Sequence, residues 1–193
     1  MAYIDTDADL KPYLGIAGAV TGDDALLDGI CTRTKAIIDA YCRRTFEASA
    51  NTDRTFDAVR DVDNQVLRLD SDLCEINSIT NGDGTIVTTA QYTTEPRNMT
   101  PYYAIRLLNS SGVAWMYTTD PEDSITISGK WAYSTAAPDD IVQAALRLGA
   151  YIYRQKDNSL DLDRTIIAGA STILPMALPA DIKVLLAPYR RLI

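Results

Sequence analysis

The sequence predicts an α+β fold, in which a small bundle of about four helices is interrupted by a β-strand-rich insertion between the second and third long helical segments. Near both ends of the 193-residue chain, apolar residues recur at steps of three and four, which is the spacing of an amphipathic helix. Between them, short runs rich in Thr, Val, Ile and Tyr alternate with Gly, Asn, Asp and Pro, a pattern typical of strands and turns. We therefore expect a helical core of residues 1–48 and 136–193 and a β-rich insertion of residues 49–135.

The longest predicted helix runs from Asp23 to Arg44. Its apolar positions are Leu26, Leu27, Ile30, Thr34, Ile37, Ile38 and Tyr41. At about 100° per residue these positions fall on one face of the helix. Two aspartates stand at its positive end and two arginines at its negative end, which complements the helix dipole. A helix with one apolar stripe must pack on other elements, and the remaining helical segments are the candidates.

Three further helices are predicted. A short one covers residues 6–15 and stops at its last residue, a glycine, because glycine commonly ends helices. Another begins at Pro138 and the last one at Pro179. Each of these prolines is followed closely by aspartate, and both residue types suit the first turn of a helix. Pro188 is expected to kink or end the last helix.

The insertion contains six runs that read as strands. They are Arg54–Val59, Gln65–Leu69, Cys74–Thr80, Ile86–Thr88, Ala104–Leu108 and Ser124–Tyr133. The sequence Asn81-Gly82-Asp83-Gly84 lies between two of these runs and is the clearest signal for a hairpin turn. The side chains expected to line an inner face are Leu67, Leu69, Ile76 and Ile79.

Residues 156–178 show no sustained periodicity. A stretch of this length without an element is unusual in a compact domain, and such stretches are generally functional or disordered. This one contains the apolar residues Ile166, Ile167, Ile173 and Leu174. They argue against simple disorder, since apolar side chains favour being covered. These side chains could be covered by a neighbouring subunit or by the rest of their own subunit.

Composition narrows the class of function. The chain has 26 acidic and 18 basic residues, a net charge of −8, and no histidine. The acidic excess argues against a sequence-independent DNA binder, because phosphate contact needs a surface of Lys and Arg. Plain solubility explains the excess more simply. The lack of histidine removes the commonest general base and the commonest metal ligand.

No arrangement of residues indicates catalysis, a cofactor or a metal. Cys31 and Cys42 fall on nearly the same face of the long helix but about 16 Å apart along its axis, beyond disulfide reach. Closely spaced aspartates occur at Asp5-x-Asp7-x-Asp9, Asp61-x-Asp63, Asp70-x-Asp72 and Asp161-x-Asp163. None continues into a calcium-binding loop, so solvated turns and helix caps explain them better. A Ser-His-Asp site is excluded without histidine.

The sequence also carries no membrane or secretion signal. No apolar run approaches the length of a membrane span, and the first residues lack the basic start and apolar stretch of a signal peptide. We expect a protein of the cytosol, or of an assembly built there.

Four pieces of sequence, taken in order, carry a resemblance. They are Asp9-Leu10-Lys11-Pro12-Tyr13-Leu14-Gly15, Leu26-Leu27 through Cys42-Arg43-Arg44-Thr45-Phe46, Pro138-Asp139-Asp140-Ile141-Val142, and Leu186-Ala187-Pro188-Tyr189-Arg190-Arg191. In this order the chain resembles the head-tail connector, or head-completion adaptor, family of tailed phages and phage-derived elements. The resemblance covers roughly residues 7–46 and 137–191. The β-rich insertion is longer than the compact hairpin of small family members.

The resemblance implies a non-enzymatic virion protein without cofactors. Members of the family form a ring, typically of twelve copies, beneath the portal protein of the capsid. The ring extends the DNA channel and joins the capsid to the next neck or tail-completion protein. DNA would pass through without sequence-specific binding, and no membrane is involved. By the same resemblance, the protein would be assembled in the host cytoplasm and reside in the neck of the particle.

The resemblance also implies roles for two segments. Portal binding carries over to the C-terminal segment, with Leu185, Leu186, Tyr189, Arg190 and Arg191. Contact between subunits carries over to residues 156–178, with Ile166, Ile167, Ile173 and Leu174. Without the resemblance, the two terminal arginines would simply neutralise a helix end.

Two other functions remain open. In the first, the protein is a monomeric protein-binding module that uses the β-rich insertion, with Trp115, Trp131 or nearby strand residues holding the partner. In the second, it is an enzyme whose activity would need a divalent ion at one of the aspartate pairs.

Overall fold

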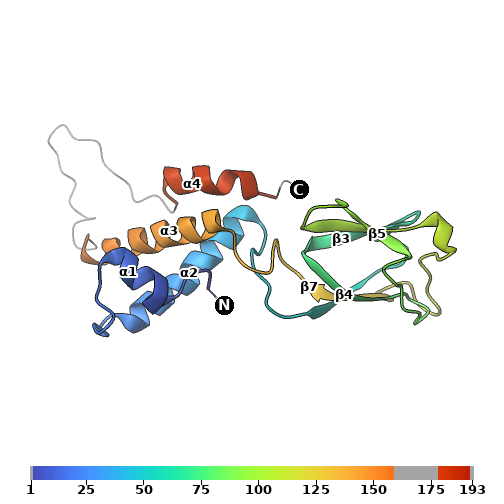
Figure 1. The fold of residues 1–193 in the computed structure, drawn as a ribbon, viewed down its shortest axis with the longest axis horizontal. Coiled ribbons are helices and arrows are strands. Elements are labelled where there is room, and N and C mark those ends of the chain that lie inside the picture. The colour runs from blue at the N-terminus through green and yellow to red at the C-terminus, as the bar shows by residue number, and fades with distance from the viewer. Residues whose placement is uncertain (1, 159–177, 192–193) are drawn as a thin grey trace. The chain divides into compact units, whose positions relative to one another are not determined.

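A computed structural model describes residues 2–158 and 178–191. The chain divides into two compact units. Met1–Arg43 and Pro138–Ile193 form one, which we call the helical unit, and Arg44–Ala137 form the other, the β unit. The described residues contain four α-helices and two antiparallel sheets, and the sheets lie in the chain between the second and third helices (Figure 1). The α+β fold predicted from the sequence is therefore confirmed.

The helical unit is built from four α-helices and two other helical segments. They are η1 (Thr6–Leu10), α1 (Lys11–Leu14), α2 (Asp24–Cys42), α3 (Asp139–Asn158), α4 (Ala180–Leu186) and η3 (Ala187–Tyr189). Helix α3 is the central element, because it packs against α2, α4, α1 and η1 (Figure 1).

The core of the helical unit lies where these helices meet. Its fully buried apolar residues include Leu10, Leu27, Ile38, Ile141, Leu148 and Leu186. Small residues of α3 let the N-terminal segment approach closely. At Gly149, a Cβ atom would lie only 3.2 Å from Cδ1 of Leu10.

The ends of the N-terminal helices differ slightly from the prediction. Helix α1 ends at Leu14, because the following Gly15 adopts a left-handed conformation with φ +76°, as the glycine signal predicts. Helix α2 ends at Cys42, two residues before the predicted Arg44, because Arg43 adopts a left-handed conformation with φ 56°. The first helical turn is capped by Asp5, one residue before the predicted start.

The β unit contains seven strands in two antiparallel sheets. They are β1 (Thr52–Phe56), β2 (Val62–Asp63), β3 (Val66–Leu73), β4 (Glu75–Thr80), β5 (Tyr92–Glu95), β6 (Tyr102–Leu107) and β7 (Ile125–Lys130). One sheet has the order β1-β7-β4 and the other the order β2-β3-β6-β5.

Both sheets contribute to one hydrophobic core. Its members are Phe56, Leu67, Leu69, Leu73, Ile79, Val87, Ile105, Leu107, Ile125, Ile127 and Trp131. The alternating pattern of β7 buries every second residue. Of the predicted inner face, Leu67, Leu69 and Ile79 are buried, and Ile76 packs against the core while partly exposed.

The strand prediction missed two strands and added one. Strands β2 and β5 are short and polar, so their sequences carry no apolar alternation. Residues 86–88 form no strand, and Ile86 makes only a single bridge, to Thr80. The predicted tight turn is present, because the backbone N–H groups of Gly84 and Asn81 donate to Asn81 and Thr85, each at 2.8 Å.

Candidate functional site

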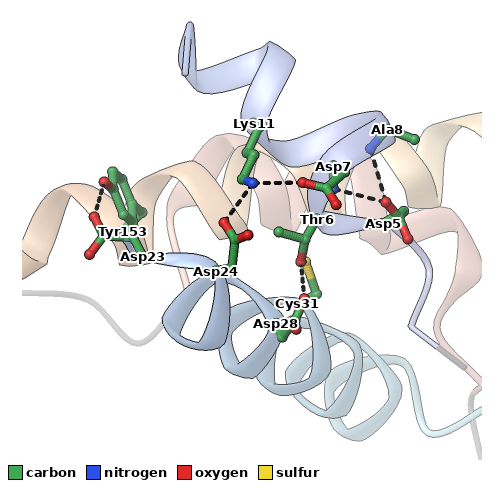
Figure 2. A network of polar contacts seen from close by, with 10 residues as sticks. All are labelled: Asp5, Thr6, Asp7, Ala8, Lys11, Asp23, Asp24, Asp28, Cys31 and Tyr153. Carbon is green, nitrogen blue, oxygen red and sulfur yellow. Dashed lines mark hydrogen bonds and ion pairs between the residues drawn. The ribbon is translucent and has the colours of Figure 1, made fainter. Parts of the chain in front are cut away.

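The aspartates near the N-terminus serve the helical unit as caps and ion pairs (Figure 2). One carboxylate oxygen of Asp5 accepts hydrogen bonds from the backbone N–H groups of Asp7, at 2.8 Å, and Ala8, at 2.9 Å. A carboxylate oxygen of Asp9 accepts from the N–H of Asp5 at 2.6 Å. These contacts agree with the predicted role of the Asp5-x-Asp7-x-Asp9 motif in helix capping.

Lys11 connects the N-terminal turn to the start of α2. Only 1% of its side chain is exposed, and its Nζ lies 2.5 Å from Oδ1 of Asp24 and 2.6 Å from Oδ1 of Asp7 (Figure 2). The hydrogen bond to Asp24, followed by the one to Asp7, raises the pKa of Lys11. The ammonium group is therefore kept charged in a position where an unpaired charge would be costly.

A second polar cluster ties the start of α2 to the end of α3. Asp23 accepts hydrogen bonds from the Tyr153 hydroxyl at 2.7 Å and from Nζ of Lys156 at 2.8 Å. Both hydrogen bonds lower the pKa of Asp23, and the bond from Lys156 has the larger effect. These bonds join residues about 130 positions apart in the chain. They therefore stabilise the packing of α2 against α3 in the helical unit.

The C-terminal segment packs on its own helical unit. Leu186 is fully buried, and its carbonyl oxygen lies 3.9 Å from the thiol of Cys42. The backbone N–H of Arg191 donates to the carbonyl of Cys42 at 2.9 Å. The Tyr189 hydroxyl donates to Oδ2 of Asp140 at 3.0 Å. Three of the five predicted portal-binding residues, Leu186, Tyr189 and Arg191, thus contact the end of α2 or the start of α3.

The other two predicted residues, Leu185 and Arg190, and the neighbouring Val184 differ in exposure. Leu185 is half-buried, whereas Val184 is 73% exposed. Arg190 is exposed, and its guanidinium carbon lies 5.3 Å from the centre of the Tyr41 ring. The predicted intersubunit residues Ile166, Ile167, Ile173 and Leu174 lie outside the residues that the structure describes.

A groove of about 370 Å³ opens between α1, α3 and the start of α4. Its lining residues are Tyr13, Arg147, Ala150, Tyr151, Arg154, Pro179, Asp181 and Ile182. Arg147 reaches Oδ2 of Asp181 at 3.4 Å, and both side chains are substantially exposed. Arg154 is exposed and has no ion-pair or hydrogen-bond partner in the described parts of the chain.

The residues of this groove carry only a weak signal in the sequence. Arg147, Tyr151 and Arg154 follow one another at steps of four and three, so they share one face of α3. That spacing was the available signal. It did not identify a groove, because the opposite wall comes from Tyr13 and from residues after position 178.

In the β unit, the buried side chain of Asn81 holds the segment around residues 114–116. The Asn81 amide nitrogen donates to the carbonyl of Ala114 at 2.9 Å, and its oxygen accepts from the N–H of Met116 at 3.1 Å. Next to this clamp, Met116 is 51% and Tyr117 45% exposed. The predicted turn therefore also holds a distant segment, 114–117, by side-chain hydrogen bonds.

Both tryptophans are engaged inside the β unit. The indole N–H of Trp131 donates to the carbonyl of Thr52 at 2.9 Å, and the side chain is almost completely buried. The indole N–H of Trp115 donates to the carbonyl of Gln65 at 3.1 Å. Trp131 also stacks against Phe56, with ring centres 5.8 Å apart. Neither indole N–H is available to a partner in this conformation.

Negative charge is concentrated in the β unit. This unit contains 13 acidic and 7 basic residues, against 13 and 11 in the helical unit. Asp120, Glu122 and Asp123 lie within one exposed turn. The carbonyl of Pro121 in this turn accepts hydrogen bonds from the N–H of Ala58 and from the Ser124 hydroxyl, both at 2.9 Å.

Within the part of the chain that the structure describes, no three His, Cys, Asp or Glu side chains are grouped as a metal site would require. None of the described helices is both long and apolar enough to span a membrane. The thiols of Cys31 and Cys74 have raised pKa values, in both cases mainly because they are buried. A raised pKa makes a thiol less nucleophilic at neutral pH.

Comparisons with known proteins identify the fold. No protein-family model matches the sequence, and no curated protein does. Two of the solved structures that contain a similar chain are the following. One is the neck of an empty gene transfer agent (GTA) particle computed with C6 symmetry, with a TM-score of 0.54 and 14% identity over 95% of this chain and 87% of that chain. The other is the neck of a native GTA particle computed with C12 symmetry, with a TM-score of 0.50 and 16% identity over 88% of each chain.

The chain thus shares its fold with a chain in these two structures of the GTA neck. The resemblance to the head-tail connector family that the sequence suggested is confirmed at the level of the fold.

Proposed function

We propose that this protein is a structural subunit of the neck of a tailed phage or phage-like particle. In this role it forms a ring beneath the portal protein, extends the DNA channel, and joins the capsid to the next neck or tail component. The observation that carries the proposal is the extent of the fold likeness, which reaches 95% of the chain and therefore includes both units. A likeness limited to two or three packed helices would carry much less, because such arrangements recur in unrelated proteins.

The symmetry of the similar structures supports a ring. They were computed with C6 and C12 symmetry, and both are compatible with the twelve copies expected from the sequence resemblance. A closed ring needs a heterologous interface, in which two different surfaces of the same chain meet. A chain with two unlike units provides unlike surfaces.

We assign portal contact to the outward side of the C-terminal segment. Leu186 is buried in the helical unit, so it anchors the segment while Tyr189 and Arg191 hold its direction through hydrogen bonds to α3 and α2. Val184 and Arg190 then face outward. They combine an apolar contact with a cation that can pair with an acidic partner. This assignment modifies the family-based prediction by giving Leu186 an anchoring role.

The charge of the chain fits passage of DNA better than binding. A ring of subunits with a net charge of −8 each would repel the phosphate backbone and leave DNA free to slide. The polar networks described above connect helices, and we infer no catalytic role and no cofactor for them. The protein would be assembled in the host cytoplasm and remain in the neck of the virion.

The proposal is tested by expressing the chain alone and together with the portal protein of the same particle, followed by mass photometry and cryo-electron microscopy. We expect discrete ring-sized particles, alone or on the portal. A chain that remains single at high concentration and has no affinity for the portal would contradict the proposal.

A monomeric protein-binding module that uses the β unit is the second candidate. The side chains of Met116 and Tyr117, exposed next to the Asn81 clamp, favour it. Trp115 and Trp131, which the sequence suggested for such a role, donate their indole N–H groups inside the unit. This candidate predicts a stable monomer whose partner binding is lost in a Tyr117→Ser variant but retained in a Val184→Asp variant.

A further inference from the structure

Among the residues that the structure describes, the lining of the groove in the helical unit has an excess of positive charge. It contains Arg147, Arg154 and one carboxylate, that of Asp181. The pair between Arg147 and Asp181 is long, at 3.4 Å, and both side chains are exposed, so it is weak. Arg154 has no partner among the described residues. The walls supply Tyr13, Tyr151 and Ile182, which suit the backbone and aliphatic parts of a polypeptide.

The β unit offers the complementary surface. Its turn at residues 120–123 is exposed and contains three acidic residues. Asp123 accepts a hydrogen bond from the Thr55 hydroxyl at 2.7 Å, whereas Asp120 and Glu122 have no partner among the described residues. The bonds to the Pro121 carbonyl hold the turn in place, so little conformational entropy would be lost on binding.

We propose that this groove receives the acidic turn Asp120–Asp123 of a second copy of the chain, an inference that rests on the proposed ring. A heterologous interface needs two different and complementary patches on one chain. A cationic groove on one unit and an acidic turn on the other meet that requirement. When two copies pair in this way, one groove and one turn stay unoccupied, so further copies can bind until the ring closes.

The dimensions agree with this pairing. Arg147 and Arg154 are seven residues apart on α3, which corresponds to about 10.5 Å along the helix axis. Asp120 and Glu122, which supply the two carboxylates without a partner among the described residues, are at most about 7 Å apart along the backbone, and the long arginine and carboxylate side chains can span the difference. Arginine suits such a contact, because its planar guanidinium binds carboxylates in a fixed geometry.

Charge reversal on each surface tests the proposal. One variant combines Arg147→Glu with Arg154→Glu, and the other combines Asp120→Lys with Glu122→Lys. All four side chains are exposed, so both variants should fold with melting temperatures close to the wild type. We expect each variant alone to form rings only at a protein concentration at least tenfold higher than the wild type needs. An equimolar mixture of the two variants should form rings at the wild-type concentration. In such a mixture, reversed grooves meet reversed turns in an alternating ring with an even number of copies.

The results separate this inference from the proposed function. If both variants and the wild type form rings equally well, the groove is not the interface, and the proposed ring stands. If each variant is defective but the mixture is not restored, the two surfaces do not meet, and the pairing is wrong. A wild-type chain that never associates, alone or with the portal, overturns both.

A cross-linking experiment identifies the contact directly. Arg154→Lys keeps the positive charge and supplies an amine, which a carbodiimide couples to a carboxylate in contact with it. Equal amounts of ¹⁴N and ¹⁵N protein are mixed before coupling, so that links between copies contain both isotopes. We expect mixed-isotope links from position 154 to the peptide containing Asp120 and Glu122. Links that are only of one isotope, or that reach other acidic residues, would overturn the proposal.

Discussion

The ammonium group of Lys11 lies 2.5 Å from Oδ1 of Asp24, and the lysine side chain is almost completely buried. This contact joins the end of η1 and the start of α1 to the first turn of α2. The partners differ greatly in exposure, because Asp24 is partly exposed and Asp7, on the other side of the lysine, is largely exposed. The buried ammonium group therefore depends more on the two carboxylates than the carboxylates, which are more exposed, depend on the ammonium group.

From this difference we predict an asymmetry between substitutions. Removing both carboxylates, with Asp7→Asn and Asp24→Asn, leaves a buried ammonium without a counterion, which is strongly destabilising. Lys11→Met instead leaves two carboxylates that water can reach. We expect the double variant to lower the melting temperature of the helical unit by several degrees more than Lys11→Met does, measured by circular dichroism at 222 nm. Equal losses in the two variants would contradict this asymmetry.

The raised pKa of Lys11 predicts a dependence of stability on alkaline pH. The folded state holds the lysine proton more tightly than the unfolded state, whose value is about 10.5. The resulting stabilisation is fully present below that value and is lost as pH rises through the higher pKa of the folded state. We expect the wild type to lose stability more steeply than Lys11→Met above about pH 10.5, in urea titrations. Parallel curves for the two proteins would contradict the prediction.

Two glycines should respond in opposite ways to alanine. In β7, a Cβ at Gly129 would lie 2.3 Å from the carbonyl oxygen of Glu75 and 2.8 Å from Cδ1 of Leu73. We expect Gly129→Ala to destabilise the β unit by about 1–3 kcal/mol, because the backbone must shift. At Gly29, inside α2, nothing lies within 4 Å, so Gly29→Ala should stabilise the helical unit by about 0.5–1 kcal/mol.

Separate signals can follow the two units in this comparison. Both tryptophans belong to the β unit, so tryptophan fluorescence reports its unfolding, whereas the helical signal at 222 nm reports mainly the other unit. A Gly129→Ala protein with an unchanged fluorescence transition would mean that the sheet accommodates the methyl group.

The anchoring and contacting roles in the C-terminal segment can be separated. Leu186 is fully buried, so Leu186→Ala should destabilise the helical unit by about 2–5 kcal/mol, as expected for a large-to-small core substitution. Val184 is largely exposed, and Val184→Asp should change stability by no more than about 0.5 kcal/mol. We nevertheless expect Val184→Asp to abolish capture of the portal in a pull-down experiment. Unimpaired capture would move the portal contact away from this face.

The sequence predicted much of the helical unit because its signals are local. The apolar stripe of α2, the glycine after α1 and the prolines before α3 and α4 each act within a few residues. The polar partners of these helices were not predictable in this way. Asp23 accepts hydrogen bonds from Tyr153 and Lys156, which are about 130 residues away in the chain. No local pattern in the sequence indicates such a pairing.

In the β unit, the reliable signals were strands with alternating apolar residues and the tight turn at Asn81. Strand β5 was missed because the sequence Tyr92-Thr93-Thr94-Glu95 has no such alternation, and its conformation is imposed by pairing with β6. The side-chain bonds of Asn81 to residues 114 and 116 were likewise invisible, since a turn signal says nothing about a distant segment.

By itself, the sequence determined the α+β class, the order of the helices, the position of the β-rich insertion and the absence of histidine chemistry, because periodicity, capping residues and composition are properties of neighbouring residues. Only the tertiary structure decided that Leu186 faces its own core, that Lys11 is buried between two carboxylates, and that Arg147 and Arg154 line a groove. Burial and pairing depend on which distant surfaces are covered when the chain folds, and that is a property of the packing.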